Sequence, residues 1–186
     1  MADGLFYLDT REPFITADIT AVTLAATNKA LYPASNFPAL GGQYFARPGK
    51  ALHIVAFGRM TTGATPGNLT LGCLYGTGAD ANGVVLASSA AVALVANQTN
   101  MSWNLDLMVH CRSIGSTGTL FTCGWFQCNP ALIASTAQPL MIPATAPVVS
   151  AACDLTSALI ISLQALRSGS TAETMQVHDV RVTALN

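Results

Sequence analysis

Charged side chains are scarce in this chain of 186 residues, where they make up only 9% of the sequence. Ordinary soluble domains carry roughly 25%. Eight lysines and arginines against nine aspartates and glutamates leave a formal net charge of −1. A protein that grips nucleic acid through its phosphates needs a basic surface, so this balance argues against a nucleic-acid partner. A hydrophobic content of 51% also argues against disorder, because disordered chains are poor in apolar groups.

Long apolar runs are missing as well. The longest, residues 90–96 and 158–161, fall far short of the roughly 18 consecutive apolar residues that a spanning helix requires. The first residues also lack the basic start and apolar stretch of a secretory signal peptide. We therefore expect no membrane partner and synthesis in a cytoplasm.

Cysteine and histidine do not cluster. The five cysteines occur at Cys73, Cys111, Cys123, Cys128 and Cys153, and no two are separated by only two residues. A zinc site needs several thiolates or imidazoles close together, which this spacing does not offer. We therefore predict no metal and no cofactor, and we interpret the cysteines as small apolar core residues in a reducing compartment.

Residues 1–50 are interrupted by prolines, which break both helices and strand ladders. This part of the chain is predicted to be an extended N-terminal arm that lies on its own body or on a neighbouring subunit, with 51–186 forming the β-sandwich domain. Residues 17–30 allow either a short strand or a helical turn. The apolar side chains that we expect to make assembly contacts are Phe6, Tyr7, Leu8, Phe14 and Ile15.

Strand patterns begin after residue 51. Residues 103–112 alternate between apolar and mostly polar side chains, which is typical of a half-buried antiparallel strand. The glycine-bearing turn 114–118 and the apolar stretch 119–128 complete a hairpin. On this pattern Trp103 and Trp125 both point into the core.

Further strands are predicted at 52–60, 69–75, 84–95 (with a break at 88–89), 158–167 and 174–185. The apolar phase of the last strand switches between Val177 and Val180, which predicts a β-bulge at His178 and Asp179. The proline-punctuated stretch 129–153 is a long connection between strand sets. The fold class is therefore all-β, an antiparallel jelly-roll or Greek-key β-sandwich.

The residues needed for catalysis do not converge. Asp106 and His110 share one strand face but lie about 13 Å apart at ~3.3 Å per residue. His178, Asp179 and Arg181 form the best titrating cluster of the sequence, and it is a weak one. Few acids remain for a pair of catalytic carboxylates. The sequence therefore predicts that the protein is not an enzyme.

The middle of the chain is nearly free of charge. Between residues 81 and 153 the only charged side chains are Asp106 and Arg112. A domain free in solution normally covers its surface with charge, so small uncharged side chains here favour flat contacts between subunits. The alternative is the Thr/Ser-rich surface of a monomer.

Residues 45–62, 65–70, 103–112 and 119–126 carry strand and turn sequences that resemble the capsid-decoration, or cement, proteins of tailed bacteriophages. The resemblance implies a jelly-roll body that is usually a homotrimer, sits on the capsid exterior of the virion and bridges neighbouring copies of a major capsid protein. We therefore expect a structural virion protein. The alternative is a tail-fibre or receptor-binding tip that recognises host glycans through its loops. An enzyme and a jelly-roll shell protein are weaker alternatives.

Overall fold

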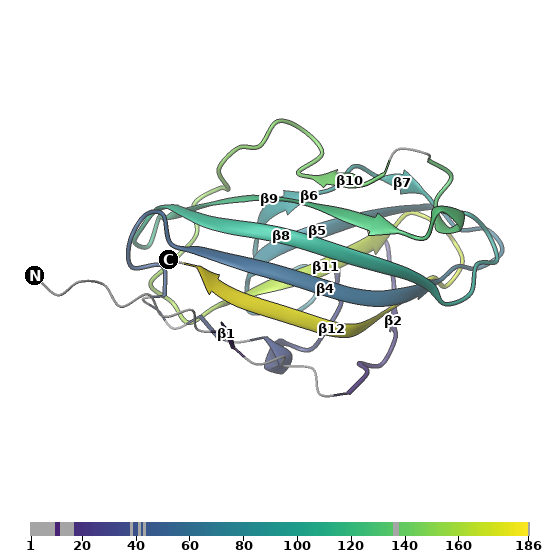
Figure 1. The fold of residues 1–186 in the computed structure, drawn as a ribbon, viewed down its shortest axis with the longest axis horizontal. Coiled ribbons are helices and arrows are strands. Elements are labelled where there is room, and N and C mark those ends of the chain that lie inside the picture. The colour runs from purple at the N-terminus through teal and green to yellow at the C-terminus, as the bar shows by residue number, and fades with distance from the viewer. Residues whose placement is uncertain are drawn as a thin grey trace, which may run out of the picture.

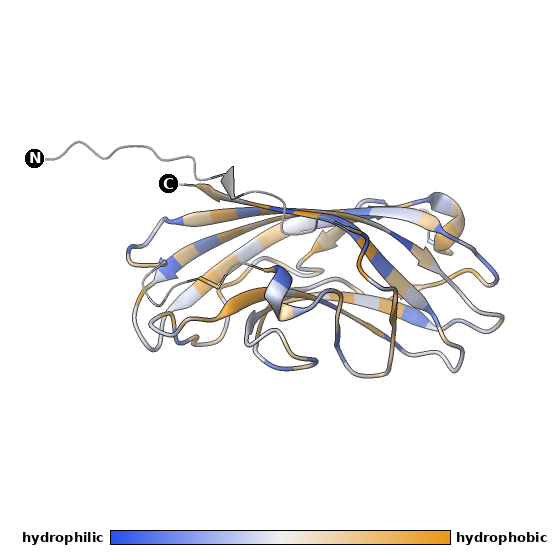
Figure 2. Ribbon diagram, turned by 90° about the horizontal axis from the view of Figure 1, so that it is seen from below, coloured by the Kyte–Doolittle hydropathy of each residue, from blue (hydrophilic) through white to orange (hydrophobic). Residues whose placement is uncertain are grey.

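The computed structural model describes residues 17–37, 39–40, 42, 44–135 and 138–185, together with the backbone of residues 10–11. Two antiparallel β-sheets face each other and enclose the core, with loops at both ends (Figures 1 and 2). The predicted all-β antiparallel sandwich is confirmed. Its jelly-roll connectivity and the division at residue 50 stay predictions.

The larger sheet has seven strands in the order β1-β12-β4-β8-β9-β10, with β2 also paired to β12. Its strands are β1 (Thr10–Arg11), β2 (Val22–Thr23), β4 (Ala51–Thr61), β8 (Met101–Ser113), β9 (Thr119–Cys128), β10 (Leu140–Ile142) and β12 (Thr174–Leu185). The predicted hairpin is the β8–β9 pair, in which Leu107 lies opposite Gly124.

The smaller sheet has five strands in the order β3-β11-β5-β6, with β7 also paired to β5. Its strands are β3 (Lys29–Ala30), β5 (Asn68–Gly76), β6 (Val84–Ser88), β7 (Val92–Ala93) and β11 (Ile160–Arg167). Two short 3₁₀ helices, η1 (Ala34–Asn36) and η2 (Pro130–Leu132), lie in the connections. The predicted break at 88–89 is the gap between β6 and β7.

The core lies between the sheets and follows the predicted alternation. In β8 the apolar set is buried, namely Trp103, Leu105, Leu107, Val109 and Cys111. In Figure 2 the strands of the larger sheet show this alternation as changes of colour along the ribbon. The predicted bulge is also confirmed, because the pairing of β12 with β4 shifts between Val177 and Asp179 and leaves His178 as the extra residue.

The described part of residues 17–50 lies on the chain's own body. Six of its side chains are buried in the common core, namely Leu24, Leu31, Tyr32, Phe37, Leu40 and Phe45. The stretch 17–30, which allowed a strand or a helical turn, forms the two short strands β2 and β3 at sheet edges. Burial of six large apolar groups ties this segment to the sandwich.

Trp125 corrects the sequence prediction. Its register partners are Asp106 on β8 and Met141 on β10, so all three lie on the outer face of the larger sheet. The core position is instead taken by Gly124, where an added Cβ would lie 2.0 Å from the carbonyl oxygen of Asp106. Residues 119–128 are apolar in both phases, so periodicity could not decide which set faces inward.

Candidate assembly surface

The five predicted contact residues of the arm, namely Phe6, Tyr7, Leu8, Phe14 and Ile15, lie outside the described residues. The candidate surface is therefore built from the body. Its starting point is residues 113–153, a stretch that contains no lysine, arginine, aspartate, glutamate or histidine. We call the surface formed by the described residues of this stretch the uncharged flank. It comprises the β8–β9 turn, β9, the connection with η2, β10 and the connection that follows β10.

Large apolar side chains are exposed on this flank. Six are exposed among the described residues, and four belong to the uncharged flank, namely Ile114, Met141, Val148 and Val149. The other two, Phe57 and Val85, lie on β4 and β6. Val148 and Met141 are 69% and 60% exposed, respectively. Exposed apolar groups carried by one stretch without charged residues are typical of a surface that another protein covers.

The backbone of the flank explains why these side chains point outward. After β10 pairs with β9, residues 143–148 leave the sheet as an exposed loop that rises above β10 in Figure 1. The chain returns to the β9 edge where Val149 bridges Phe121 and Cys153 bridges Gly118. The segment therefore forms main-chain hydrogen bonds with the edge of β9, and its side chains remain free for contacts.

A buried serine holds this returning segment. The amide of Ser150 donates to the carbonyl of Leu120 at 2.8 Å, and the amide of Leu120 donates to the Ser150 hydroxyl at 3.1 Å. That hydroxyl donates in turn to the carbonyl of Ala151 at 2.7 Å. The loop is thus anchored at its base while Val148 and Val149 remain in solvent.

Arg112 and His110 stand at the border of the flank. The Arg112 guanidinium lies 4.6 Å from the centre of the Phe121 ring, a cation–π contact. Partial burial, with a further contribution from the charge of Arg112, lowers the pKa of His110. The lowered pKa favours the uncharged form of His110 at neutral pH, whereas Arg112 carries a positive charge at this border of the uncharged flank.

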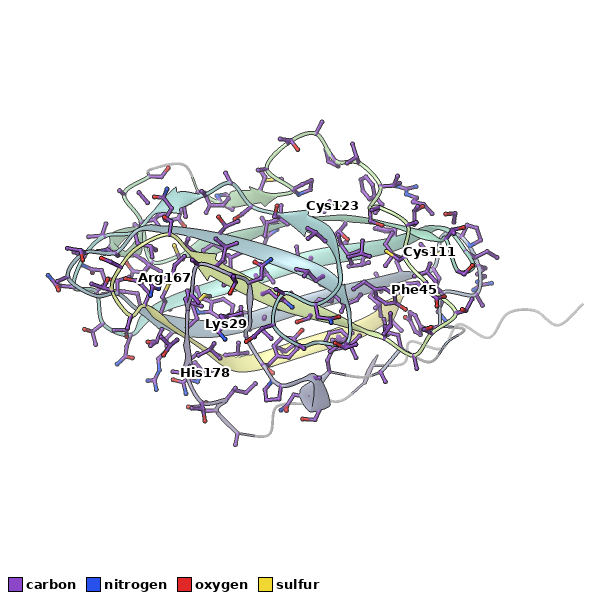
Figure 3. All side chains as sticks on the ribbon, turned by 180° about the vertical axis from the view of Figure 1, so that it is seen from behind. Lys29, Phe45, Cys111, Cys123, Arg167 and His178 are labelled. Atoms are coloured by element: carbon purple, nitrogen blue, oxygen red, sulfur yellow. The ribbon has the colours of Figure 1, made fainter. Side chains whose placement is uncertain are left out.

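The charged residues gather elsewhere. We call the described residues 17–32, together with β11, β12 and the turn between these two strands, the ion-paired flank. It holds His178 and Asp18 (2.6 Å), Arg167 and Glu173 (2.9 Å), and Arg181 and Asp179 (2.8 Å), and its Lys29 pairs with Asp80. In Figure 3 Lys29, Arg167 and His178 lie toward one side, and Cys123 of the uncharged flank toward the other.

The predicted cluster at the β12 bulge is split between partners. His178 contacts Asp18 of the N-terminal segment, whereas Asp179 accepts a hydrogen bond from Arg181. Asp106 and His110 do share a face, as predicted, but the structure instead pairs Asp106 with His53 at 3.0 Å. Sequence reasoning missed this pair because the two residues meet only through the β4–β8 register, in which His53 lies opposite Met108.

Reactive or metal-binding groups do not gather in the described part of the chain. There, no group of three or more His, Cys, Asp or Glu side chains could hold a metal ion. All five cysteines are free thiols, and four are buried as predicted. Burial raises the pKa of the Cys73 thiol to about 12 and that of Cys128 to about 11, which makes both poor nucleophiles. Cys123 is the exception to the core prediction, because it lies half-buried on the outer face.

Comparison with protein-family models, with curated proteins and with solved structures found no match to this chain. Within the described residues, no helix has the length and hydropathy needed to cross a membrane.

Proposed function

We propose that this protein is a non-enzymatic structural protein of a phage particle, a capsid decoration protein. In this proposal it associates with copies of itself as a homotrimer on the capsid exterior and bridges copies of the major capsid protein. The observation that carries the proposal is the uncharged flank, where Ile114, Met141, Val148 and Val149 are exposed. The sequence resemblance supplies the particle and the partner.

The proposed mechanism is mechanical. Burying ~100 Å² of apolar surface contributes roughly 2.5 kcal/mol, and only the excess over the cost of association stabilises the contact. A flank without charges loses little hydration energy when it is covered, because an unpaired charge would be expensive to bury. Repetition of the same contact over a symmetric shell then strengthens the whole assembly through multivalency.

Charge insertion tests the role of the uncharged flank. We expect the double variant Met141→Glu/Val148→Glu to fold normally, because both side chains are exposed, and to lose self-association and co-sedimentation with purified phage heads. Two buried, unpaired carboxylates should weaken the contact by at least a hundredfold. The matched control is Val85→Glu, since Val85 is also exposed, at 50%, but lies on β6 of the other sheet.

Two results would contradict the proposal. One is undiminished binding of the double variant to heads and to itself, and the other is a wild-type protein that stays monomeric and does not co-sediment with heads.

The arm is tested separately by deleting residues 1–16. That variant should form a folded oligomer that no longer binds capsids, and full capsid binding would remove the arm from the proposal.

The second candidate is a tail-fibre or receptor-binding tip that recognises host glycans. One observation favours it, a hollow lined by apolar and uncharged polar residues at the end of the outer face, where β8 begins. A tip protein would bind cells or glycans, whereas a decoration protein would co-sediment with heads. The same binding experiment therefore separates the two.

A further inference from the structure

We infer that the hollow at the start of β8 is a binding site for a neutral saccharide. The hollow has a volume of about 420 Å³ and is lined by residues of β4, β8, β9 and the start of η2. Ligand pockets generally measure roughly 300–1,000 Å³, so a single sugar ring is within its capacity. The inference does not depend on the proposed role in assembly.

Three lining side chains stand in one row across the sheet. Phe57 on β4 lies opposite Asn104 on β8, which lies opposite Gln127 on β9. All three point away from the core, and Phe57 is 41% exposed. An exposed aromatic ring beside two planar amides complements both kinds of surface on a sugar. The C–H face of the sugar packs on the aromatic ring, and the sugar hydroxyls form hydrogen bonds with the amides.

The polar groups of the hollow are available to a ligand. Among the described residues, neither the Asn104 nor the Gln127 side chain has a hydrogen-bond partner. Asn129 uses its side-chain oxygen to accept from the amide of Ala131 at 2.9 Å, a bond that does not engage its NH₂ group. Amides both donate and accept, as hydroxyl groups do, so they suit a ligand rich in hydroxyls.

The lining determines which ligands are excluded. It contains no charged side chain. The charged groups nearest to the hollow on the outer face are already engaged. Arg59 donates to Gln176 at 2.7 Å, Asp179 accepts from Arg181 at 2.8 Å, and Asp106 pairs with His53 at 3.0 Å. A phosphate, carboxylate or ammonium ligand would lose hydration without gaining a counter-charge. The site therefore favours a neutral ligand.

The experiment is a nuclear magnetic resonance titration of the isolated wild-type protein with glucose, galactose and N-acetylglucosamine, each as the monomer and as a β-linked dimer. N-acetylneuraminic acid serves as the charged comparison. We expect at least one neutral sugar to bind and to shift the side-chain amide signals of Asn104 and Gln127, which the Asn104→Ala and Gln127→Ala variants assign. The charged sugar should bind more weakly or not at all.

Three variants locate the site. Phe57→Ala and Asn104→Ala should each weaken binding about tenfold, the size of effect expected from the loss of one good contact. Gln127→Ala gives an independent answer should Phe57→Ala fail to fold. Val85→Ala is the control, because Val85 is also exposed but lies on β6 of the other sheet and does not line the hollow.

Two outcomes would overturn the inference. In one, none of the neutral sugars binds the folded protein at tens of millimolar, or only the charged sugar does. In the other, a sugar binds but neither Phe57→Ala nor Asn104→Ala changes its affinity. Neither outcome affects the co-sedimentation test, so failure here is distinguishable from failure of the proposed function.

Discussion

The uncharged flank and the ion-paired flank lie on opposite sides of one sandwich and present different surfaces. On the ion-paired flank, charged side chains are used inside the molecule, where Arg167 of β11 bonds to the Leu24 carbonyl, His178 of β12 pairs with Asp18, and Lys29 pairs with Asp80 in the turn after β5. On the uncharged flank, main-chain bonds and a buried serine secure the edge of β9, and apolar side chains face solvent.

The two flanks use charged side chains differently. Ion pairs on one flank hold a segment that has few ladder bonds of its own, because β2 and β3 contain two residues each. Removing charge on the other flank makes that surface easy to cover, since no ionic hydration is lost. We therefore expect changes on the ion-paired flank to alter stability and changes on the uncharged flank to alter association.

The largest stability effect should come from the buried ion pair. Glu173 is fully buried, and the Arg167 side chain is 16% exposed. The Arg167 Nε–H donates to the carbonyl of Leu24 at 2.8 Å, so its contact with the carboxylate is primarily ionic. Glu173→Ala leaves this guanidinium without its counter-charge, and we expect a loss of about 3–5 kcal/mol in the free energy of unfolding, measured with urea.

The exposed ion pair on the same flank provides the control. Arg181 is 67% exposed, so Arg181→Ala should cost at most about 1 kcal/mol. The double variant Arg167→Met/Glu173→Leu should be more stable than Glu173→Ala, because it leaves no buried charge unpaired. Equal losses for Glu173→Ala and Arg181→Ala would show that burial does not set the strength of these pairs.

A smaller effect is expected at Tyr32, which joins the N-terminal segment to β11. Its buried hydroxyl donates to the carbonyl of Ile161 at 3.1 Å and accepts from the amide of Leu163 at 3.2 Å. Tyr32→Phe removes both bonds and should lower the free energy of unfolding by about 1–3 kcal/mol. Ser35→Ala, at an exposed neighbouring position, should change it by less than about 0.5 kcal/mol. Identical thermal midpoints for both variants would contradict this assignment.

The smallest effect concerns pH at the border of the uncharged flank. Burial and then Arg112 lower the pKa of His110 from its ordinary value of 6.5, so the unfolded chain binds a proton more readily than the folded protein. The resulting stability is fully present above that value and is lost as pH falls toward the folded-state pKa. Wild type should therefore lose more stability than His110→Gln between about pH 7.5 and about pH 5. Equal losses of unfolding free energy for wild type and His110→Gln, measured by urea titration, would refute this role of His110.

Much of the fold followed from residue patterns. The alternation of residues 103–112 identified β8 and its buried face, because one side of a strand repeats every second residue. The phase switch before Val180 located the bulge at His178. The scarcity of charge between Arg112 and Asp154 marked the uncharged flank before any strand order was available.

The features that the sequence did not predict depend on the register between strands. Residues 119–128 carry apolar side chains in both phases, and only pairing with Asp106 and Met141 places Trp125 outside. The His53–Asp106 pair and the row formed by Phe57, Asn104 and Gln127 likewise come from separate strands. The sequence by itself determined the long strands, the turns between them and the lack of charge, because these are local properties, but it left 17–30 open and missed β10 within the predicted connection 129–153. Only the tertiary structure decided which side chains meet, because pairing between distant strands sets every neighbour across a sheet.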